Sequence, residues 1–426
     1  MTPIDAPLNR PASELPASCE VLVVGAGPAG SAAARSLAQA GLDVVLVDQQ
    51  AFPRDKVCGD GLIPDTHRAL ERLGVLDEVM ALAQPVQHVR CIGPRGGFID
   101  VPGRLAVLPR RELDLVLCRA AAAAGARMHA PLRFLAPIED EGGRVVGARL
   151  RAGEVASEIR ARWVILASGA APQATLAAGM CERRTPSAIA LRGYVKNDAM
   201  VGRITELEVL WHRRIKPGYG WIFPCRDGVF NIGVGVSHSH RKGRGGRHAM
   251  TDVNLREVFT AFTEAHPAAR ALMDGGQLLG ELKGAPLRCS LAGAQLARPG
   301  LLVAGEAAGS TYALTGEGIG KALETGLLAA EAVAADLRDP APETEAIATQ
   351  ATCHRYAAAI EALRPRFDIY ERADTVNAHP WLVDLLVWSA KRSPRRLQRM
   401  SGVLEETHTP GNLVTPRNLL RLVFGR

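Results

Sequence analysis

The chain has 426 residues, of which 47% are hydrophobic and 22% charged, a balance typical of a folded protein. The net charge is +7, but aromatic residues make up only 4% of the chain and no basic stripe is interleaved with them, so we expect no nucleic-acid partner. Eight scattered cysteines form no C-x-x-C pair, so we expect neither a metal site nor a disulfide framework.

The first predicted element is a β-strand, helix and second β-strand. Met1 to Ser18 is rich in proline, and we expect it to be a flexible leader. Val21–Val24 is an apolar strand, the glycine-rich turn 25–30 follows it, and a helix of small residues leads to the second strand, Val44–Val47. This order predicts a βαβ unit with the turn at the start of its helix.

The turn has the spacing G-x-G-x-x-G, which is typical of dinucleotide binding between a strand and a helix. Gly25 permits a tight turn, Gly27 lets the backbone approach a pyrophosphate, and Gly30 allows close packing of helix on strand. Asp48 ends the second strand, where it can accept a hydrogen bond from a ribose hydroxyl. We place these residues and Ala29 at a dinucleotide cofactor.

The following elements alternate between the two kinds of secondary structure. Residues 67–81 and 111–124 are predicted helices, residues 86–101 and 144–159 predicted hairpins, and residues 163–167 a buried strand. Between residues 185 and 288, alternating stretches predict an antiparallel sheet, and residues 255–272 within this region are a predicted helix. A buried strand at 301–304, a long helix at 318–337 and a mostly helical remainder complete the chain.

Two motifs identify the cofactor. The G-E-A-A-G sequence at 305–309 resembles the second flavin motif of the p-hydroxybenzoate hydroxylase superfamily, usually G-D-A-A-H, with Glu306 in place of the usual Asp. Arg110 matches the arginine of that superfamily's R-x-x-F-D segment. The resemblance implies that the dinucleotide is FAD, that Gly305 and Glu306 lie near its ribityl chain, and that Arg110 contacts it.

Three further segments narrow the family. The sequence F-P-R-D-K-V-C-G-D-G-L at 52–62, the sequence Y-G-W-I-F-P at 219–224 with its later G-V-G, and T-G-E-G-I at 315–319 resemble segments of geranylgeranyl reductases and mycobacterial menaquinone reductases. This resemblance places a further set of residues at the flavin: Lys56, Cys58, Gly59, Gly316, Gly318 and Ile319.

The implied fold is α/β: a Rossmann-like FAD-binding domain of the p-hydroxybenzoate hydroxylase type, an antiparallel-sheet substrate domain and a helical C-terminal region. We assign residues 19–85, 105–184 and 289–338 to the FAD-binding domain, residues 86–104 and 185–288 to the substrate domain, and residues 339–426 to the helical region.

Such reductases are similar in saturating prenyl C=C bonds with reduced FAD, so the expected substrate is an isoprenoid or lipid-like chain. An unactivated alkene requires water exclusion, alignment and a proton source. Trp221 and Phe223 are candidates to wall an apolar slot, or are simply core residues. Tyr219 is a candidate wall and proton donor. Cys58 is a candidate proton donor or redox thiol whose pKa nearby Lys56 would lower, or else a small packing residue.

Other activities fit the same superfamily. A monooxygenase that hydroxylates or epoxidises requires little beyond a shaped pocket, and a flavin desaturase would run the chemistry oxidatively. Flavin halogenases carry W-x-W-x-I-P, whereas this chain has Tyr219 and Phe223 at the differing positions. A non-enzymatic flavin-binding partner protein is a fourth alternative. One dinucleotide motif implies that NAD(P)H, another electron donor or a redox partner protein reduces the flavin without a second Rossmann domain.

Two basic segments are candidates for binding a ligand or a membrane. His238, His240 and His248 lie among arginines, which disfavour a metal, so we expect a solvated loop that could also receive an anionic substrate group. The segment 381–388 is apolar with two tryptophans and is followed by five cations, which suits a membrane surface as well as a helix packed on the core. No apolar run reaches the roughly 18 residues that span a bilayer. We therefore expect a cytoplasmic protein, or one peripheral on the inner face of the membrane.

Overall fold

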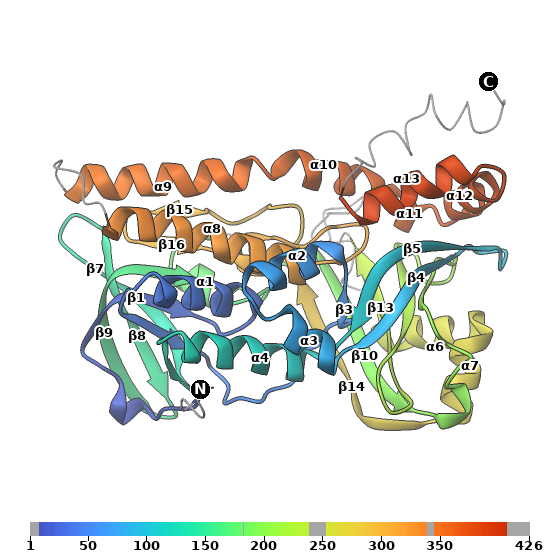
Figure 1. Ribbon diagram of the computed structural model, residues 1–426, viewed down its shortest axis with the longest axis horizontal. Helices are drawn as coiled ribbons and strands as arrows, with labels where there is room; N and C mark the ends of the chain where they lie inside the picture. The colour runs from blue at the N-terminus through green and yellow to red at the C-terminus, as the bar shows by residue number, and fades with distance from the viewer. Residues whose placement is uncertain (1–7, 182, 238–252, 339–344, 407–426) are drawn as a thin grey trace.

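The computed structural model describes residues 8–181, 183–237, 253–338 and 345–406. Each of the two lobes is built on one eight-stranded sheet, and helices of the C-terminal region run along one side of both (Figure 1). The predicted α/β fold class is confirmed. The histidine-containing segment 238–248 lies outside the described residues.

The first lobe has a parallel sheet at its centre. Its strands follow the order β15-β16-β9-β1-β2-β6, and β7 and β8 extend it beside β9. Their bounds are β1 (Ser18–Val24), β2 (Val44–Val47), β6 (Arg127–His129), β7 (Arg133–Glu139), β8 (Val145–Ala152), β9 (Val155–Leu166), β15 (Ala297–Arg298) and β16 (Leu301–Val303). Strands β1 and β2 pair in parallel, which confirms the predicted βαβ unit.

The central strands are apolar throughout because both faces of the sheet are covered. Residues 21–24 and 44–47 are at most 4% exposed. Helices α1 (Pro28–Gln39), α4 (Arg110–Ala123) and α8 (Ile319–Arg338) cover one face, and side chains of β7 and β8 pack against the other. Helices α1 and α8 touch closely: a Cβ atom at Gly326 would lie 2.1 Å from the carbonyl oxygen of Ala29. Shorter helices complete this lobe: α5 (Gln173–Ala177), η1 (Ala12–Glu14) and η3 (Gly305–Ala308).

The second lobe is a largely antiparallel sheet in the order β14-β10-β13-β12-β11-β4-β5-β3. Its strands are β3 (Gly61–Leu62), β4 (Gln84–Ile92), β5 (Phe98–Val107), β10 (Ala188–Lys196), β11 (Leu207–Leu210), β12 (Gly218–Pro224), β13 (Val229–Ser237) and β14 (Gln277–Leu287). Strand β11 pairs with β4 in parallel, which joins the early hairpin to the later strands. The short η2 (Asp198–Met200) follows β10.

Two predicted helices are each broken in two. The first is divided into α2 (Pro64–Arg72) and α3 (Leu76–Leu82) at Gly74, whose φ of 67° ends the first helix. The second is divided into α6 (Leu255–Ala265) and α7 (Pro267–Asp274), because Pro267 has no N–H to continue the hydrogen-bond pattern.

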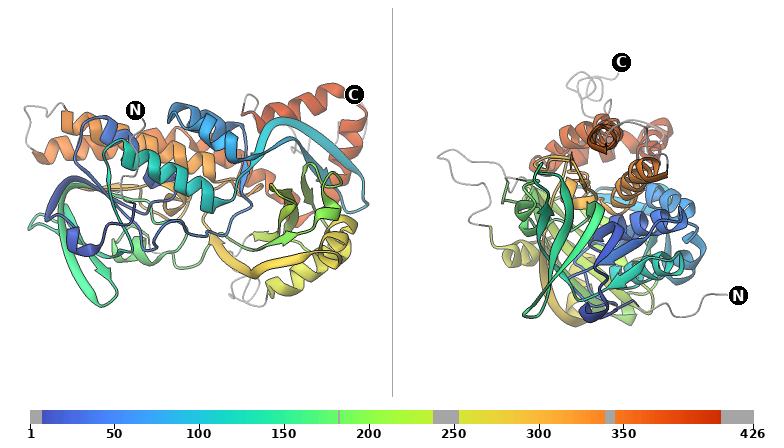
Figure 2. Two further views of the ribbon diagram at one scale, coloured as in Figure 1. Left: turned by 60° about the horizontal axis from the view of Figure 1, so that its bottom comes forward. Right: turned by 90° about the vertical axis from the view of Figure 1, so that its left-hand side faces the viewer.

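The C-terminal helices link the lobes. They are α9 (Glu345–Glu361), α10 (Arg364–Ala373), α11 (Thr375–Ala378), α12 (Trp381–Lys391) and α13 (Pro394–Leu404). Helix α9 lies along α8 on the first lobe, whereas α12 and α13 lie over β4 and β5 of the second (Figures 1 and 2). Among the described residues, no helix has the length and hydropathy to cross a bilayer.

The leader prediction is wrong for residues 8–17. The side-chain amide of Asn9 donates to the carbonyl of Phe52 at 2.7 Å, and its oxygen accepts the Phe52 N–H at 2.8 Å. The N–H of Arg10 donates to the carbonyl of Met128. These hydrogen bonds tie the segment to the first lobe.

Candidate FAD and substrate site

A cavity of about 780 Å³ is lined by residues of both lobes. At one end it is lined by the glycine-rich turn 25–29 and by Asp48. At the other end it is lined by apolar side chains of the second sheet and of α12 and α13. Every residue that the sequence places at the cofactor, other than Gly30 and Gly305, lines this cavity.

The glycine-rich turn has the geometry that a pyrophosphate requires. Gly25 adopts a φ of 101°, and a Cβ atom on Gly30 would lie 1.7 Å from the carbonyl oxygen of Gly25. At Gly27 the nearest atoms to such a Cβ are the guanidinium groups of Arg54 and Arg110, both 3.7 Å away. The space beside Gly27 is therefore open, faced by two guanidinium groups and at the N-terminus of α1.

Asp48 is held where the second strand ends. Its carboxylate accepts hydrogen bonds from the backbone N–H groups of Ala26 and Gln50, both at 2.9 Å. The side chain is 6% exposed and faces the cavity. A carboxylate has about four lone-pair sites, so it retains acceptor capacity for a hydroxyl group.

Arg110 and Arg54 share one buried carboxylate. Arg110 donates two hydrogen bonds to Asp114 at 2.7 and 2.9 Å, and Arg54 lies 3.2 Å from the same carboxylate and 3.6 Å from Asp48. Sequence reasoning singled out Arg110 but missed Arg54. Arg54 stands inside the quoted P-R-x-K-x-C-G segment, so the signal was present, but its approach to the glycine-rich turn depends on the fold.

The loop 54–61 is fastened to the second sheet. Arg192, which is 2% exposed, donates to the Asp55 carboxylate and to the carbonyl of Lys56, both at 3.0 Å. Asn231 donates to the carbonyl of Cys58 at 2.8 Å and to Asp60 at 2.7 Å. These contacts place Cys58 against the second lobe.

Asn231 also reaches the aromatic segment. Its side-chain oxygen accepts the indole N–H of Trp221 at 2.9 Å, so one amide joins Trp221 to the Cys58 loop. The carboxylate of Asp60 also accepts a hydrogen bond from the hydroxyl of Tyr194. Burial raises the pKa of Asp60 to about 6, although these hydrogen bonds oppose the shift. Asn231 was not predicted from the sequence; it lies two positions before the first glycine of the quoted G-V-G.

The prediction that positive charge lowers the pKa of Cys58 is wrong. Burial raises the pKa of this thiol, and the carboxylate of Asp60 raises it further, so the opposing effects of Arg110 and Lys56 are outweighed. The ammonium group of Lys56 donates to the carbonyl of Val57 at 3.2 Å. Cys58 is therefore a protonated thiol that faces the cavity.

Aromatic side chains of β12, together with Trp211 directly after β11, form one wall of the cavity. The ring centroids of Trp211 and Tyr219 are 5.7 Å apart, those of Tyr219 and Trp221 6.3 Å, and those of Trp221 and Phe223 6.4 Å. The Tyr219 hydroxyl donates to the carbonyl of Thr315. These rings both pack in the core and line the cavity, so the two interpretations of them are compatible. Trp211 was missed by the sequence analysis.

The Phe223 ring also touches the Cys58 loop. A Cβ atom on Gly59 would lie 3.2 Å from this ring and 3.7 Å from the indole nitrogen of Trp221. Glycine at this position allows the loop and the aromatic wall to approach one another.

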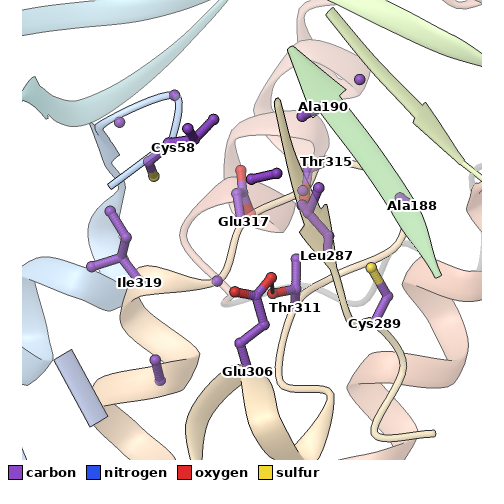
Figure 3. Close-up of a pocket in the computed structure, with 18 of the residues that line it drawn as sticks. Cys58, Ala188, Ala190, Leu287, Cys289, Glu306, Thr311, Thr315, Glu317 and Ile319 are labelled. Carbon is purple, nitrogen blue, oxygen red and sulfur yellow. Dashed lines mark hydrogen bonds between the residues drawn. The ribbon is translucent and has the colours of Figure 1, made fainter. Parts of the chain in front are cut away.

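The second flavin motif lies across the cavity from Cys58 (Figure 3). Glu306 accepts a hydrogen bond of 3.4 Å from the hydroxyl of Thr311 and faces the cavity. Gly316 has a φ of 68°, and a Cβ atom there would lie 2.7 Å from the Tyr219 hydroxyl. The loop 315–319 therefore packs directly against the aromatic wall. Helix α8 begins at the end of this loop, at Ile319.

Family comparison supports the same assignment. Residues 18–363 match the family model described as an FAD binding domain. The menaquinone reductase of Mycobacterium tuberculosis is 35% identical over 341 residues, which cover 76% of this chain and 78% of that protein. The chain belongs to this family of FAD-dependent oxidoreductases.

Archaeal relatives and solved structures extend the comparison. The digeranylgeranylglycerophospholipid reductase of Methanoculleus marisnigri is 30% identical, with 73% of this chain and 75% of that protein covered. A geranylgeranyl bacteriochlorophyll reductase-like protein from Thermoplasma acidophilum has a TM-score of 0.73 at 23% identity, with 96% of each chain covered. The myxobacterial halogenase CndH has a TM-score of 0.67 at 19% identity, with 95% and 99% covered. Likeness at this level of identity establishes the fold that the family shares.

Replacing Arg54 with alanine should weaken FAD binding by roughly 10- to 100-fold, because a charge-assisted hydrogen bond contributes about 1.5–3 kcal/mol. The measurement is the FAD dissociation constant from flavin fluorescence. Arg149→Ala is the matched control, since Arg149 pairs with Glu158 on an exposed hairpin away from the cavity. Equal affinities for the two variants would rule out a phosphate contact for Arg54.

Proposed function

We propose that this protein saturates C=C bonds of an isoprenoid or similar lipid-like chain with electrons from FAD. The apolar end of the cavity is the observation that carries the proposal. Its walls are residues of β4, β5 and β11 and of α12 and α13: Val89, Cys91, Ile99, Val101, Val209, Val383, Val387, Met400 and Leu404. We name this region the apolar chamber. A hydrocarbon tail gains about 25 cal/mol for each Å² that it buries there.

The proposal distributes the cofactor along the cavity. Gly25, Gly27, Ala29 and Gly30 would hold the pyrophosphate with Arg54 and Arg110 beside it, while Asp48 would accept from the ribose. Gly305 and Glu306 would lie at the ribityl chain. The flavin ring would lie between the loop 315–319 and the segment 56–59. Bound there, reduced FAD supplies hydride.

The chain's own residues would align the alkene and exclude water. Trp221 and Phe223 present apolar surface beside the Cys58 loop, and Asn231 fixes both sides of that space. Tyr219 would complete the wall, with its hydroxyl committed to Thr315. The discontinuous assignment of domains remains a proposal. It gives residues 61–62 of β3, 84–85 of β4 and 105–107 of β5 to the FAD-binding domain, although these strands belong to the second sheet.

The names of the relatives favour reduction over the alternatives. The menaquinone and digeranylgeranylglycerophospholipid reductases reach 35% and 30% identity, whereas the halogenase CndH reaches 19% and shares the fold. A short polar pocket would favour a hydroxylase of aromatic substrates, but the apolar chamber has no such character.

The test is mass spectrometry of products after incubation with prenylated menaquinone or with a digeranylgeranyl lipid. Chemically reduced FAD serves as the electron source under nitrogen, and air is admitted to a parallel sample. Reduction adds two hydrogens per bond. Insertion of one oxygen in air would establish a monooxygenase instead, and loss of two hydrogens with oxidised FAD would establish a desaturase.

We further propose that NAD(P)H or another small electron carrier, or a redox partner protein, reduces the flavin. The rate of flavin bleaching with NADH, with NADPH and with reduced ferredoxin under nitrogen identifies the donor.

We also propose contact with the cytoplasmic face of a membrane through α12 and the tip of the β4–β5 hairpin. Trp381 and Trp388 are 56% and 43% exposed on one face of α12, and Phe98, the first residue of β5, is 41% exposed. Lys391 lies 5.3 Å from the Phe98 ring, and Arg392 lies 4.0 Å from the Trp388 ring. Exposed aromatics next to cations match the chemistry of an anionic lipid surface. The opposite face of α12 lines the apolar chamber, so a lipid would have a short path into it.

Reversing both charges in Lys391→Glu/Arg392→Glu should reduce sedimentation with anionic vesicles by at least about tenfold at low salt, since each basic residue near the surface contributes about 1 kcal/mol. Arg149→Glu/Arg151→Glu changes the same charge on the remote β8 strand and serves as control. Equal sedimentation of the two variants, or none by the unmodified protein, would contradict this docking surface.

A further inference from the structure

Glu317 is an acidic side chain that projects into the cavity near Cys58 (Figure 3). Its loop is held rigidly: the N–H of Tyr312 donates to the carbonyl of Glu317, and the N–H of Gly316 donates to the carbonyl of Tyr312, both at 2.9 Å. The hydroxyl of Tyr219 holds the neighbouring carbonyl of Thr315. The position of the carboxyl group is therefore set by the loop and by the aromatic wall together.

Among the described residues, no cation forms an ion pair with Glu317. The ammonium group of Lys321 on α8 acts on Glu317, but it is already bound by three carboxylates: Glu324 at 2.7 Å, Glu406 at 2.9 Å and Asp65 at 3.4 Å. Asp65 of α2 and Glu406 beyond α13 act on Glu317 with the same sign of charge. An unpaired carboxylate in this enclosed position is unfavourable, and the neutral acid is preferred.

Burial, with Asp65 as the second cause, raises the pKa of Glu317 to about 8. The carboxyl group is thus protonated at neutral pH, and it can release a proton near the pH at which the protein works. The other two candidate donors are weaker acids. Burial raises the pKa of the Tyr219 phenol, whose hydrogen is already committed to Thr315, and burial raises the pKa of the Cys58 thiol.

We propose that Glu317 is the catalytic acid of the reduction, the group that protonates the second carbon of the C=C bond. This inference rests on the proposed function. In the step, the π bond breaks, hydride from reduced FAD forms one C–H bond, and the proton of Glu317 forms the other. The flavin is oxidised by two electrons and the alkene is reduced by two. The carboxylate left behind regains its proton from water after the product leaves.

The role requires the protonated form, so turnover should be constant below about pH 8 and fall above it. The charged and polar groups that act on Glu317 are Asp65 of α2, Lys321 of α8, Glu406 and the hydroxyl of Thr315, together with the phenols of Tyr219 on β12 and Tyr370 on α10. Burial raises the pKa of both phenols, so they stay neutral through this pH range. Since Lys321 stays paired with its three carboxylates, the loss of activity at high pH follows from Glu317.

The decisive comparison is Glu317→Gln with Glu317→Asp. The control is Glu331→Gln on the exposed face of α8, the helix that follows the Glu317 loop. Infrared spectra of the protein without substrate should contain a protonated carboxyl band that disappears in Glu317→Gln and persists in Glu331→Gln. The FAD dissociation constant should change less than about twofold. Oxidation of reduced flavin by the prenyl substrate should slow by roughly 100-fold or more in Glu317→Gln, and by less in Glu317→Asp.

The outcomes separate the two proposals. An unmodified protein that makes no saturated product overturns the proposed function and this role with it. An unmodified protein that reduces the substrate, together with a Gln variant within about threefold of its rate, overturns the role of Glu317 alone. A loss of FAD affinity that matches the loss of rate in Glu317→Gln also overturns it, because the side chain would then be a cofactor contact.

Discussion

Replacing Gly27 with valine is expected to abolish FAD binding while the protein stays folded. Gly27 has a φ of −78°, which any residue adopts, and a side chain there would enter the open space in front of α1. That space is the one that the pyrophosphate needs, next to the helix N-terminus and the two guanidinium groups. We expect the FAD dissociation constant to rise by at least roughly 100-fold.

The measurement is flavin content after purification, followed by titration of the apoprotein with FAD. Gly142→Val, in an exposed turn of the β7–β8 hairpin, is the matched control and should bind FAD normally. Circular dichroism and the melting temperature without FAD should agree between the two variants. A Gly27→Val protein that retains FAD would show that the pyrophosphate lies elsewhere.

Filling the apolar chamber should have the second large effect. Val209 on β11 lines the chamber directly opposite Trp221 in the register of the sheet. In Val209→Trp, the larger side chain would occupy volume that a long hydrocarbon tail needs. We expect kcat/KM for a substrate with four isoprene units to fall by about 100-fold, since excluding even part of such a tail removes about 0.8 kcal/mol for each buried CH₂.

A substrate with one isoprene unit should be affected much less, and the ratio of the two kcat/KM values is the measurement. Val201→Trp is the control, because Val201 is 60% exposed and away from the cavity. If the variant slowed both substrates equally, the defect would lie at the reacting end and the chamber would not hold the tail.

Much of the fold was predictable because it is encoded locally. The apolar strands at 21–24 and 44–47 and the glycine spacing between them predict the βαβ unit without reference to the rest of the chain. The two helix breaks were missed because apolar periodicity continues across Gly74 and Pro267, although each residue interrupts the backbone pattern. The leader was misjudged because Asn9 finds its partner, Phe52, more than forty residues away.

The residues of the site were largely predictable from motifs, but their pKa values and contacts were not. The sequence placed Cys58 beside Lys56, yet the pKa of the thiol is set by burial and by Asp60, which the fold positions. Arg54 and Glu317 stand inside the quoted segments, but only the structure shows that one faces the glycine-rich turn and the other the cavity. Asn231 acts through three contacts, and two of its partners, Cys58 and Asp60, lie 173 and 171 residues away in the sequence, so no local pattern reveals its role.

The amide of Asn231 has a consequence for selectivity. It ties the loop of one lobe to Trp221 of the other, so the width of the reacting space is fixed, while the apolar chamber is closed by separate helices, α12 and α13. A repetitive prenyl chain presents the same chemical group at every unit. The C=C bond that is reduced would then be set by its distance from the end of the tail. Changes in the length of the apolar chamber would alter which bonds are saturated without altering the reaction.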